Sequence, residues 1–373
     1  MSTLAVDAIV DSSNGNTATI NGTTPTAYNT MGKNLIINGA MEIAQRGTSA
    51  TISTAQSYKT VDRIKATGGF GGYTNTESQD TSVVPEGFTT SYKWANTASA
   101  GAISSGAYNV IDYKVEGYSM SHLDWGKSSA KTVTLSFYVR SGVTGTYGIG
   151  LLNGTSNVYM TTYTVNSADT WERKTIVIPG PTVGSWNTTT STGLTIRWDM
   201  GVGTTYSTST TEDWTLSGNI WGYTGGVKFV ETNNVDFYLT GVQLEAGSVA
   251  TEFERRPYGT ELALCQRYYE KSWNVETAVP TATDVSSCMF LANRNPGFPH
   301  ILLNYKVTKR TSPTIVLYSS TTNTTGKFRN LDAAVDIDGG SSRIGANQAT
   351  LYSLTSTSLG QFIQFHYTIS AEL

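Results

Sequence analysis

Apolar and polar residues alternate in short segments along most of the chain. In 131–140 and in 192–200, every second residue is apolar and the residues between them are mostly polar. The apolar positions are Val133, Leu135, Phe137 and Val139 in the first segment, and Leu194, Ile196, Trp198 and Met200 in the second. A period of two is typical of a β-strand that packs one face against a core. Both segments therefore predict strands, and Trp198 is predicted to be a core residue.

One such segment, 235–245, changes phase part-way along its length. Its apolar residues stand at odd positions up to Leu239 and at even positions from Val242 onward, with Gly241 at the change. A glycine at a change of phase indicates a β-bulge or a bend between two sheets. Many short strands with such interruptions predict a β-sandwich or jelly roll over residues 33–258.

A short helix is predicted after this domain, in a linker that spans residues 259–276. Thr260 is a suitable N-cap residue and Glu261 suits the positive end of a helix. We therefore expect about three helical turns over 261–271. Cys265 lies on the apolar stripe of this helix, where a buried free thiol is favoured over a disulfide with the other cysteine of the chain.

Residues 277–373 form a second region with strand-like alternation. Apolar residues alternate in 301–307 and again in 363–369. These segments predict a second, smaller β-sandwich. His366 falls on the opposite face of its strand from its apolar neighbours, so it is predicted to lie on the protein surface.

The first 32 residues differ from the rest of the chain. Residues 1–32 are rich in Ser, Thr, Asn and Gly and contain only a few apolar residues. Such a segment cannot bury enough apolar surface to fold alone. Two interpretations fit this composition: an extended arm that becomes ordered only against a partner chain or a particle, or a disordered tail.

Composition and charge exclude several function classes. The chain has 373 residues, of which 38% are hydrophobic and only 14% charged, and its frequent Gly, Thr and Tyr residues favour strands and turns. The net charge is −3 without any run of Lys or Arg, which argues against a nucleic-acid partner. No apolar run approaches the roughly 20 residues of a membrane span, so membrane insertion is not expected. The first residues also lack the pattern of a signal peptide.

Signatures of catalysis and of cofactor binding are missing from the sequence. The three histidines, His122, His300 and His366, have no His, Cys or carboxylate partner at metal-ligand spacing. The sequence also lacks a nucleophile elbow and a phosphate-binding loop. Carboxylates for glycosidase chemistry are present, but no pair of them stands out. We therefore predict no catalytic residues, no metal site and no cofactor.

Tryptophan is the residue type that suggests a ligand. Sugar rings stack their apolar faces on Trp and Tyr, and polar side chains bind the sugar hydroxyls. Five of the eight tryptophans fall between residues 171 and 221. Among these, Trp186 and Trp214 lie in polar, turn-rich stretches, so they are the candidates for a glycan-stacking surface.

Four segments of the chain carry recognisable motifs. They are 34–47, which contains Asn-Leu-Ile-Ile-Asn-Gly and Gln-Arg-Gly; 61–64, Val-Asp-Arg-Ile; 242–256, which begins Val-Gln-Leu-Glu; and 261–271, which contains Cys-Gln-Arg-Tyr-Tyr. Together these segments resemble the tail-fibre and virion-surface proteins of bacteriophages, especially marine ones. In that family, such segments open and close a jelly roll similar to a carbohydrate-binding module. The match frames most of the chain, and its segments look architectural.

The resemblance implies a virion structural protein without enzymatic activity. Such a protein would be a fibre or spike, anchored to the particle by the arm of residues 1–32 through contacts with other virion proteins. It would be exposed on the particle surface and would bind a host-surface glycan, and its relatives are usually homotrimers. Two alternatives stay open: a capsid or tail decoration protein without a receptor, and a glycan depolymerase.

Overall fold

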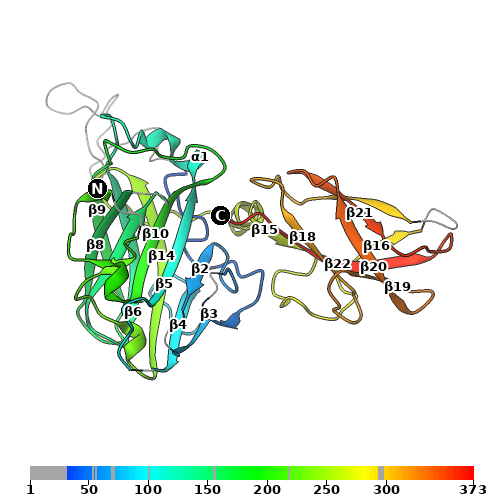
Figure 1. Cartoon of the computed structure of the whole chain (residues 1–373), viewed down its shortest axis with the longest axis horizontal. Helices are drawn as coiled ribbons and strands as arrows, with labels where there is room; N and C mark the ends of the chain where they lie inside the picture. The colour runs from blue at the N-terminus through cyan, green and yellow to red at the C-terminus, as the bar shows by residue number, and fades with distance from the viewer. Residues whose placement is uncertain are drawn as a thin grey trace, which may run out of the picture.

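The computed structural model contains two β domains joined end to end, which gives the molecule an elongated shape (Figure 1). It describes residues 32–373, except for residues 53, 55–56, 69–71, 100, 154–156, 217–218 and 293–297. The predicted arm, residues 1–32, lies outside the described residues apart from Gly32. The larger domain precedes helix α2 (Tyr258–Gln266), and the smaller domain follows it. The prediction of an all-β chain with a jelly-roll sandwich, a short helix and a smaller C-terminal β domain is confirmed.

Two six-stranded antiparallel sheets form the larger domain. The first contains, in spatial order, β1 (Ser49–Thr51), β3 (Thr74–Asp80), β4 (Ser91–Ala98), β14 (Val235–Ala246), β6 (Val133–Ser141) and β9 (Glu172–Ile178). The second contains β12 (Trp214–Leu216), β8 (Asn157–Val165), β7 (Gly145–Leu152), β10 (Thr192–Val202), β5 (Tyr108–Glu116) and β2 (Ile64–Thr67).

Short elements connect these strands. A small parallel sheet pairs β11 (Ser207–Thr208) with β13 (Gly222–Tyr223). Single helical turns are α1 (Gly117–Met120), η1 (Ser121–Leu123), η2 (Thr204–Tyr206) and η3 (Phe229–Glu231).

The main core lies between the two sheets and contains the residues that the alternation predicted. The eight apolar positions of β6 and β10 named above are all fully buried. Because β6 and β10 belong to different sheets, their apolar faces meet, and the rings of Phe137 and Trp198 lie 5.8 Å apart between centroids. Burial of one large apolar side chain is worth about 1.5–3 kcal/mol, so this interface holds the two layers together.

The predicted irregularity in β14 is a β-bulge. The pairing register between β14 and β6 shifts between Thr240 and Gln243. Gly241 has a φ of 60°, and a Cβ atom at this position would lie 2.7 Å from the ring of Phe88 and 2.9 Å from that of Tyr138. The backbone conformation and the two close rings therefore both require glycine.

The smaller domain is arranged around one long strand, β22 (Phe362–Ser370). Four strands pair with it: β15 (Tyr269–Lys271), β16 (Cys288–Leu291), β18 (Thr314–Tyr318) and β19 (Lys327–Asn330). The sheet continues from β19 through β20 (Val335–Ser342), β21 (Gln348–Ser353) and β17 (His300–Asn304). A second core forms here, with Phe328, Phe365 and Ile369 fully buried.

Helix α2 differs from the predicted helix at both ends. It begins at Tyr258 with Pro257 as its N-cap residue, and it ends at Gln266. Residues 269–271 form strand β15, which pairs with β22, instead of a last helical turn. Two consecutive tyrosines have low helix propensity, so the sheet pairing prevails. Cys265 is a fully buried free thiol, as predicted.

The predicted surface position of His366 is wrong, because this side chain is fully buried. Its ring stacks on Trp273 with 4.1 Å between ring centroids, and its two nitrogens contact the Ser272 hydroxyl at 2.7 Å and the Thr283 carbonyl at 2.9 Å. The segment that follows β15 thus covers the second face of β22. Burial lowers the pKa of His366.

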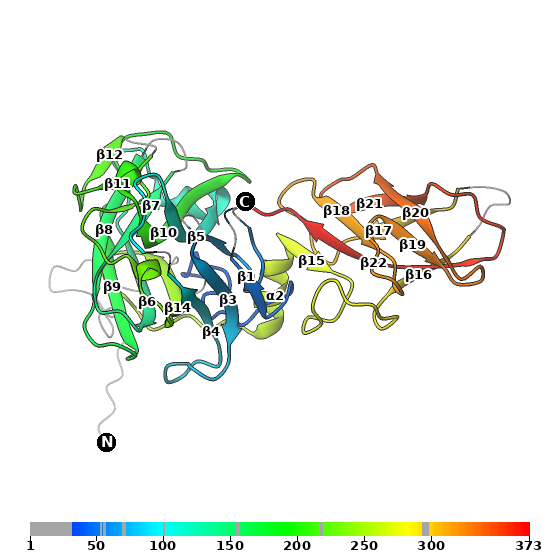
Figure 2. The ribbon, with the colours of Figure 1, turned by 60° about the horizontal axis from the view of Figure 1, so that its bottom comes forward.

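The two domains meet at a polar junction, where the C-terminus of the chain also lies (Figure 2). The Glu372 carboxylate pairs with Arg46 at 3.0 Å and with the guanidinium of Arg63. Each guanidinium also lies 3.6 Å from the ring centroid of one of two consecutive tyrosines: Arg63 over Tyr268 and Arg46 over Tyr269. The larger domain therefore holds both the start and the end of the smaller one.

Glu116 at the end of β5 adds a second charged contact to this junction. It accepts two hydrogen bonds from the Arg267 guanidinium, at 2.9 and 2.7 Å, and one from the Tyr268 hydroxyl at 2.6 Å. Burial opposes ionisation of this carboxyl, but these three hydrogen bonds hold its pKa below the usual value. Glu116 is therefore a charged anchor for the end of helix α2.

All four segments that carry the sequence resemblance converge on the junction. Segment 34–47 contributes Arg46, segment 61–64 contributes Arg63, and segment 261–271 contributes the two tyrosines. In segment 242–256, Arg256 pairs at 3.4 Å with Glu261 of helix α2. These segments fix the helix and the smaller domain to the sandwich.

We expect Glu372→Gln to lower the free energy of unfolding by about 3 kcal/mol, because it leaves the buried Arg63 guanidinium without a charged partner. Urea denaturation followed by tryptophan fluorescence measures this change. The control is Asp338→Asn, which breaks an exposed ion pair with Lys327 and should cost less than about 1 kcal/mol. Equal losses in the two variants would refute a dependence on the junction carboxylate.

Candidate functional site

The structure brings the two predicted stacking residues, Trp186 and Trp214, next to each other. Their ring centroids lie 5.3 Å apart and the rings are nearly perpendicular. Trp125 completes a triangle, at 4.7 Å from Trp186 and 5.5 Å from Trp214. Trp214 belongs to β12, whereas the other two rings come from connecting segments. The sequence did not single out Trp125, because its part in the cluster depends on tertiary contacts.

This tryptophan triangle closes one edge of the core between the sheets. Trp125 is buried, and Trp186 and Trp214 are half-buried against the core cluster. Each indole N–H donates to a backbone carbonyl, at distances of 2.8 to 3.3 Å. Much of the surface of both predicted residues is therefore used within the fold, and a ligand could reach only the part that stays exposed.

A second group of aromatic residues lies on the outer face of the second sheet. Tyr108 of β5 lies opposite Val202 of β10 on this face. Tyr206 and Trp221 reach the same face from the segment that follows β10, and their rings lie 5.7 and 4.2 Å from the ring of Tyr108. All three rings are half-buried. We call Tyr108, Tyr206 and Trp221 the aromatic platform.

A buried ion pair orients the platform. Arg197 points outward between two core residues of β10, and its Nε and Nη2 atoms donate to the two carboxylate oxygens of Asp112 at 2.7 Å each. This bidentate pairing fixes the plane of the guanidinium. The same guanidinium lies 3.9 Å from the ring centroid of Trp221, so a cation–π contact in turn fixes the indole.

Asp199 holds the segment that carries Trp221 against the sheet. Its carboxylate accepts hydrogen bonds from the backbone N–H groups of Tyr223 at 3.0 Å and Gly201 at 2.9 Å. Burial raises the pKa of Asp199 to about 6. A Cβ atom on Gly222 would lie 2.3 Å from this carboxylate, so the close approach of the segment requires glycine.

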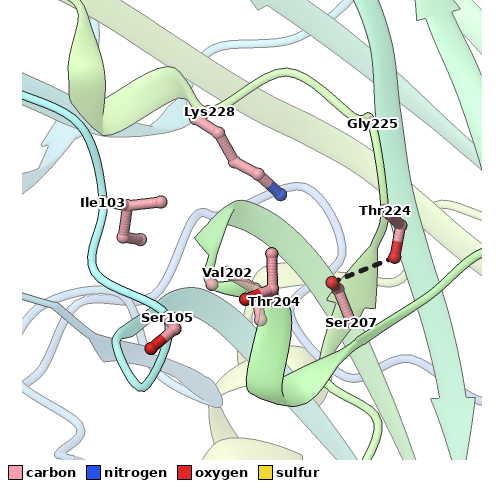
Figure 3. A pocket seen from close by; sticks show the side chains of 9 residues that line it. Ile103, Ser105, Val202, Thr204, Ser207, Thr224, Gly225 and Lys228 are labelled. Atoms are coloured by element: carbon pink, nitrogen blue, oxygen red, sulfur yellow. Dashed lines mark hydrogen bonds between the residues drawn. The ribbon is translucent and has the colours of Figure 1, made fainter.

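A pocket of about 300 Å³ adjoins the platform (Figure 3). Hydroxyl groups, two aliphatic side chains and one ammonium group line it: Ser105, Thr204, Ser207, Thr224, Ile103, Val202 and Lys228. Figure 3 shows the Lys228 side chain extending into this space, opposite the hydrogen bond of 3.0 Å between Thr224 and Ser207. The platform and the pocket share turn η2, since Tyr206 stands between two residues that line the pocket.

Together, the platform and the pocket offer the chemical groups that sugars need. Half-buried rings provide apolar surface for the C–H face of a pyranose, and the pocket provides hydroxyl groups for its polar edge. The sequence did not predict this arrangement, because Tyr108 is far in sequence from Tyr206 and Trp221. The available signal was the outward position of Tyr108 on its strand.

Two negative findings concern the part of the chain that the structure describes. Within it, no three His, Cys, Asp or Glu side chains are grouped in a way that could hold a metal ion. None of the helices described is long and apolar enough to cross a membrane.

No protein-family model and no curated protein sequence matches this chain. Solved structures with which it shares some similarity include the enzymatically active domain of tailspike protein 4 of bacteriophage CBA120. That match has 12% identity and a TM-score of 0.28, and it covers 57% of this chain and 21% of that one. This chain thus spans about a fifth of the tailspike structure's length.

Two further similar structures are described as sugar-binding proteins. A putative sugar binding protein from Bacteroides thetaiotaomicron has 9% identity and a TM-score of 0.31, with 58% of this chain and 100% of that chain covered. A family 11 carbohydrate-binding module from Clostridium thermocellum, in complex with a mixed-linked tetrasaccharide, has 13% identity and a TM-score of 0.25. The latter match covers 55% of this chain and 99% of that chain.

We expect Trp214→Ala to lower the free energy of unfolding by about 3 kcal/mol, the low end of the range for buried tryptophan. The reason is the loss of ring contacts with Trp125 and Trp186 and of the indole hydrogen bond. Tyr118→Ala removes an aromatic side chain that is 59% exposed, and it should leave stability within about 0.5 kcal/mol of the wild type. Thermal unfolding of both variants distinguishes a packed tryptophan from a freely exposed one, and an unchanged Trp214→Ala protein would contradict the packing role.

Proposed function

We propose that this protein is a non-enzymatic surface protein of a phage particle, a fibre or spike that binds a host-surface glycan through the outer face of its second sheet. The observation that carries the glycan-binding part is the half-buried aromatic platform beside a pocket lined by hydroxyl groups. Sugars combine apolar faces with hydroxyl edges, and this surface offers a partner for each.

The pre-formed geometry of the platform supports this proposal. Arg197, Asp112 and Asp199 hold Trp221 in place through contacts within the protein. A surface that is ordered beforehand loses little conformational entropy on binding. Half-buried aromatic rings with buried polar supports are therefore suited to weak, repeated contacts with a glycan-coated surface.

The virion part of the proposal rests on the sequence resemblance of segments 34–47, 61–64, 242–256 and 261–271 to phage fibre proteins. In this proposal, residues 1–32 anchor the chain to other virion proteins, and three copies associate. A decoration protein without a receptor is the alternative, and it would keep the anchoring arm but bind no glycan. A depolymerase would release reducing ends from a polysaccharide.

We expect Trp221→Ala to weaken binding to polysaccharide by at least about tenfold, because it removes one of the three rings of the aromatic platform. Affinity electrophoresis in gels that contain polysaccharides from host cells measures this change. The matched control is Trp171→Ala, which removes a half-buried tryptophan that packs on Tyr238 of the first sheet. The control should bind like the wild type.

Trp186→Ala and Trp214→Ala belong in the same series. A loss of binding in these variants alone, with Trp221→Ala unchanged, would place the glycan at the tryptophan triangle and reject the platform. If the polysaccharide gels retard neither the wild-type protein nor any variant, the decoration alternative is favoured. Release of reducing ends during the assay would overturn the non-enzymatic proposal.

We expect a chain that lacks residues 1–32 to fold, because the described domains contain both cores. The same chain should fail to incorporate into particles, since the arm is the proposed anchor. Immunoblotting of purified particles measures incorporation, and circular dichroism of the free protein checks the fold. Light scattering should give the mass of a trimer for the full chain. Normal incorporation of the shortened chain would refute the anchoring role.

A further inference from the structure

Two lysines stand next to the aromatic platform on the outer face of the second sheet. Lys65 of β2 lies directly opposite Asp112 of β5, and Asp112 lies directly opposite Arg197 of β10. Lys114 follows two residues after Asp112, so it points to the same face. Both lysines are half-buried, and because Lys114 stands diagonally across the strand pair from Lys65, their side chains are neighbours on this face.

On this face four positive side chains (Lys65, Lys114, Arg197 and Lys228) stand against two carboxylates (Asp112 and Asp199), and Lys228 lies 3.7 Å from Asp199. The Asp112 carboxylate is already bound by the Arg197 guanidinium through two hydrogen bonds. Glu372, which also acts on Lys65, is paired with Arg46 and Arg63 at the junction. Among the described residues, neither Lys65 nor Lys114 forms an ion pair.

Two adjacent ammonium groups repel each other, and partial burial strengthens that repulsion. Desolvation and the neighbouring Lys65 lower the pKa of Lys114 to about 8, with Arg197 acting in the same direction and Asp112 against it. An anion placed between the two lysines would remove this unfavourable interaction. The chain has a net charge of −3, so a local excess of positive charge is not a general property of its surface.

The lysines and the platform lie within reach of one short ligand. Lys65 and Arg197 are separated by two strand spacings, roughly 10 Å, and Trp221 lies on Arg197. A sugar on the platform therefore has its neighbouring unit near the lysines. An acidic group on that unit would meet two ammonium groups at once.

We propose that this face selects acidic glycans, whose carboxylate or sulfate groups are held by Lys65 and Lys114 while a neighbouring sugar contacts the aromatic platform. This inference rests on the proposed glycan-binding function and adds the class of sugar. A charge-assisted contact of this kind is stronger than a neutral hydrogen bond, and it is weakened by salt. Neutral glycans would have to leave the lysine pair uncompensated.

The test compares three polysaccharides: polygalacturonate with carboxylates, carrageenan with sulfates, and neutral dextran. We expect wild-type protein to bind one or both acidic polymers and dextran at least about tenfold more weakly. The double substitution Lys65→Gln with Lys114→Gln should reduce acidic binding about tenfold or more. Its matched control is Lys127→Gln with Lys327→Gln, which changes the net charge equally at two lysines that form exposed ion pairs, and which should bind normally.

The pH dependence of the wild-type protein is a second readout that needs no substitution. Lys114 is protonated below its pKa of about 8, so affinity for an acidic polymer should fall as the pH rises from 7 to 9. Carboxylate and sulfate groups stay ionised over this range, so the loss comes from the protein. The double lysine variant should show a flatter profile, and added salt should weaken wild-type binding.

The outcomes separate this inference from the function on which it rests. Equal binding of dextran and the acidic polymers, with the double lysine variant unchanged, would overturn the acidic-glycan inference and leave glycan binding intact. If the wild-type protein binds none of the three polysaccharides, both the acidic-glycan inference and the proposed glycan-binding function are overturned. Preference for polygalacturonate alone or for carrageenan alone would support the inference and identify the anion.

Discussion

One carboxylate, that of Glu372, fixes the end of the chain to the larger domain. It lies between Arg63 and Arg46, and the Arg63 side chain is only 1% exposed. A desolvated guanidinium is costly without a partner, so the C-terminal residues must stay inserted for this part of the sandwich to be stable. Arg63 also donates to the backbone carbonyl of Lys114 at 2.6 Å. The same guanidinium thus links the end of the chain to the strand that carries the candidate binding face.

The alternation of apolar and polar residues correctly predicted the features that depend only on neighbours within one strand. It identified Trp198 as a core residue and placed the bulge of β14 at Gly241, because both depend on the period of two and on the special conformations of glycine. It failed at Tyr269 and at His366. Both residues are determined by contacts between segments that are distant in sequence: β15 pairs with β22, and the chain after β15 covers the second face of β22.

The sequence indicated the candidate site only through one residue type, tryptophan, and not through its location in the fold. Tryptophans in polar stretches suggested Trp186 and Trp214, yet Trp214 pairs with the core residue Tyr159 and therefore packs at the core edge. Trp221 lies on the sheet face because Asp199 and Arg197 hold its segment there. A sequence indicates which strand positions face outward, but not which connecting segment crosses that face, since the crossing depends on the closed sandwich.

The position of strand β22 determines how the connection between the two domains responds to force. The smaller domain is attached to the sandwich covalently through helix α2 and β15, and non-covalently through Glu372 just beyond the end of β22. Since β15 and β22 are neighbouring antiparallel strands, both attachments leave from the same side of the smaller domain. A single attachment would allow the smaller domain to rotate about it. Two attachments side by side resist twisting and share a pulling force. A drag force on the smaller domain would therefore be transmitted to the sandwich through a rigid connection.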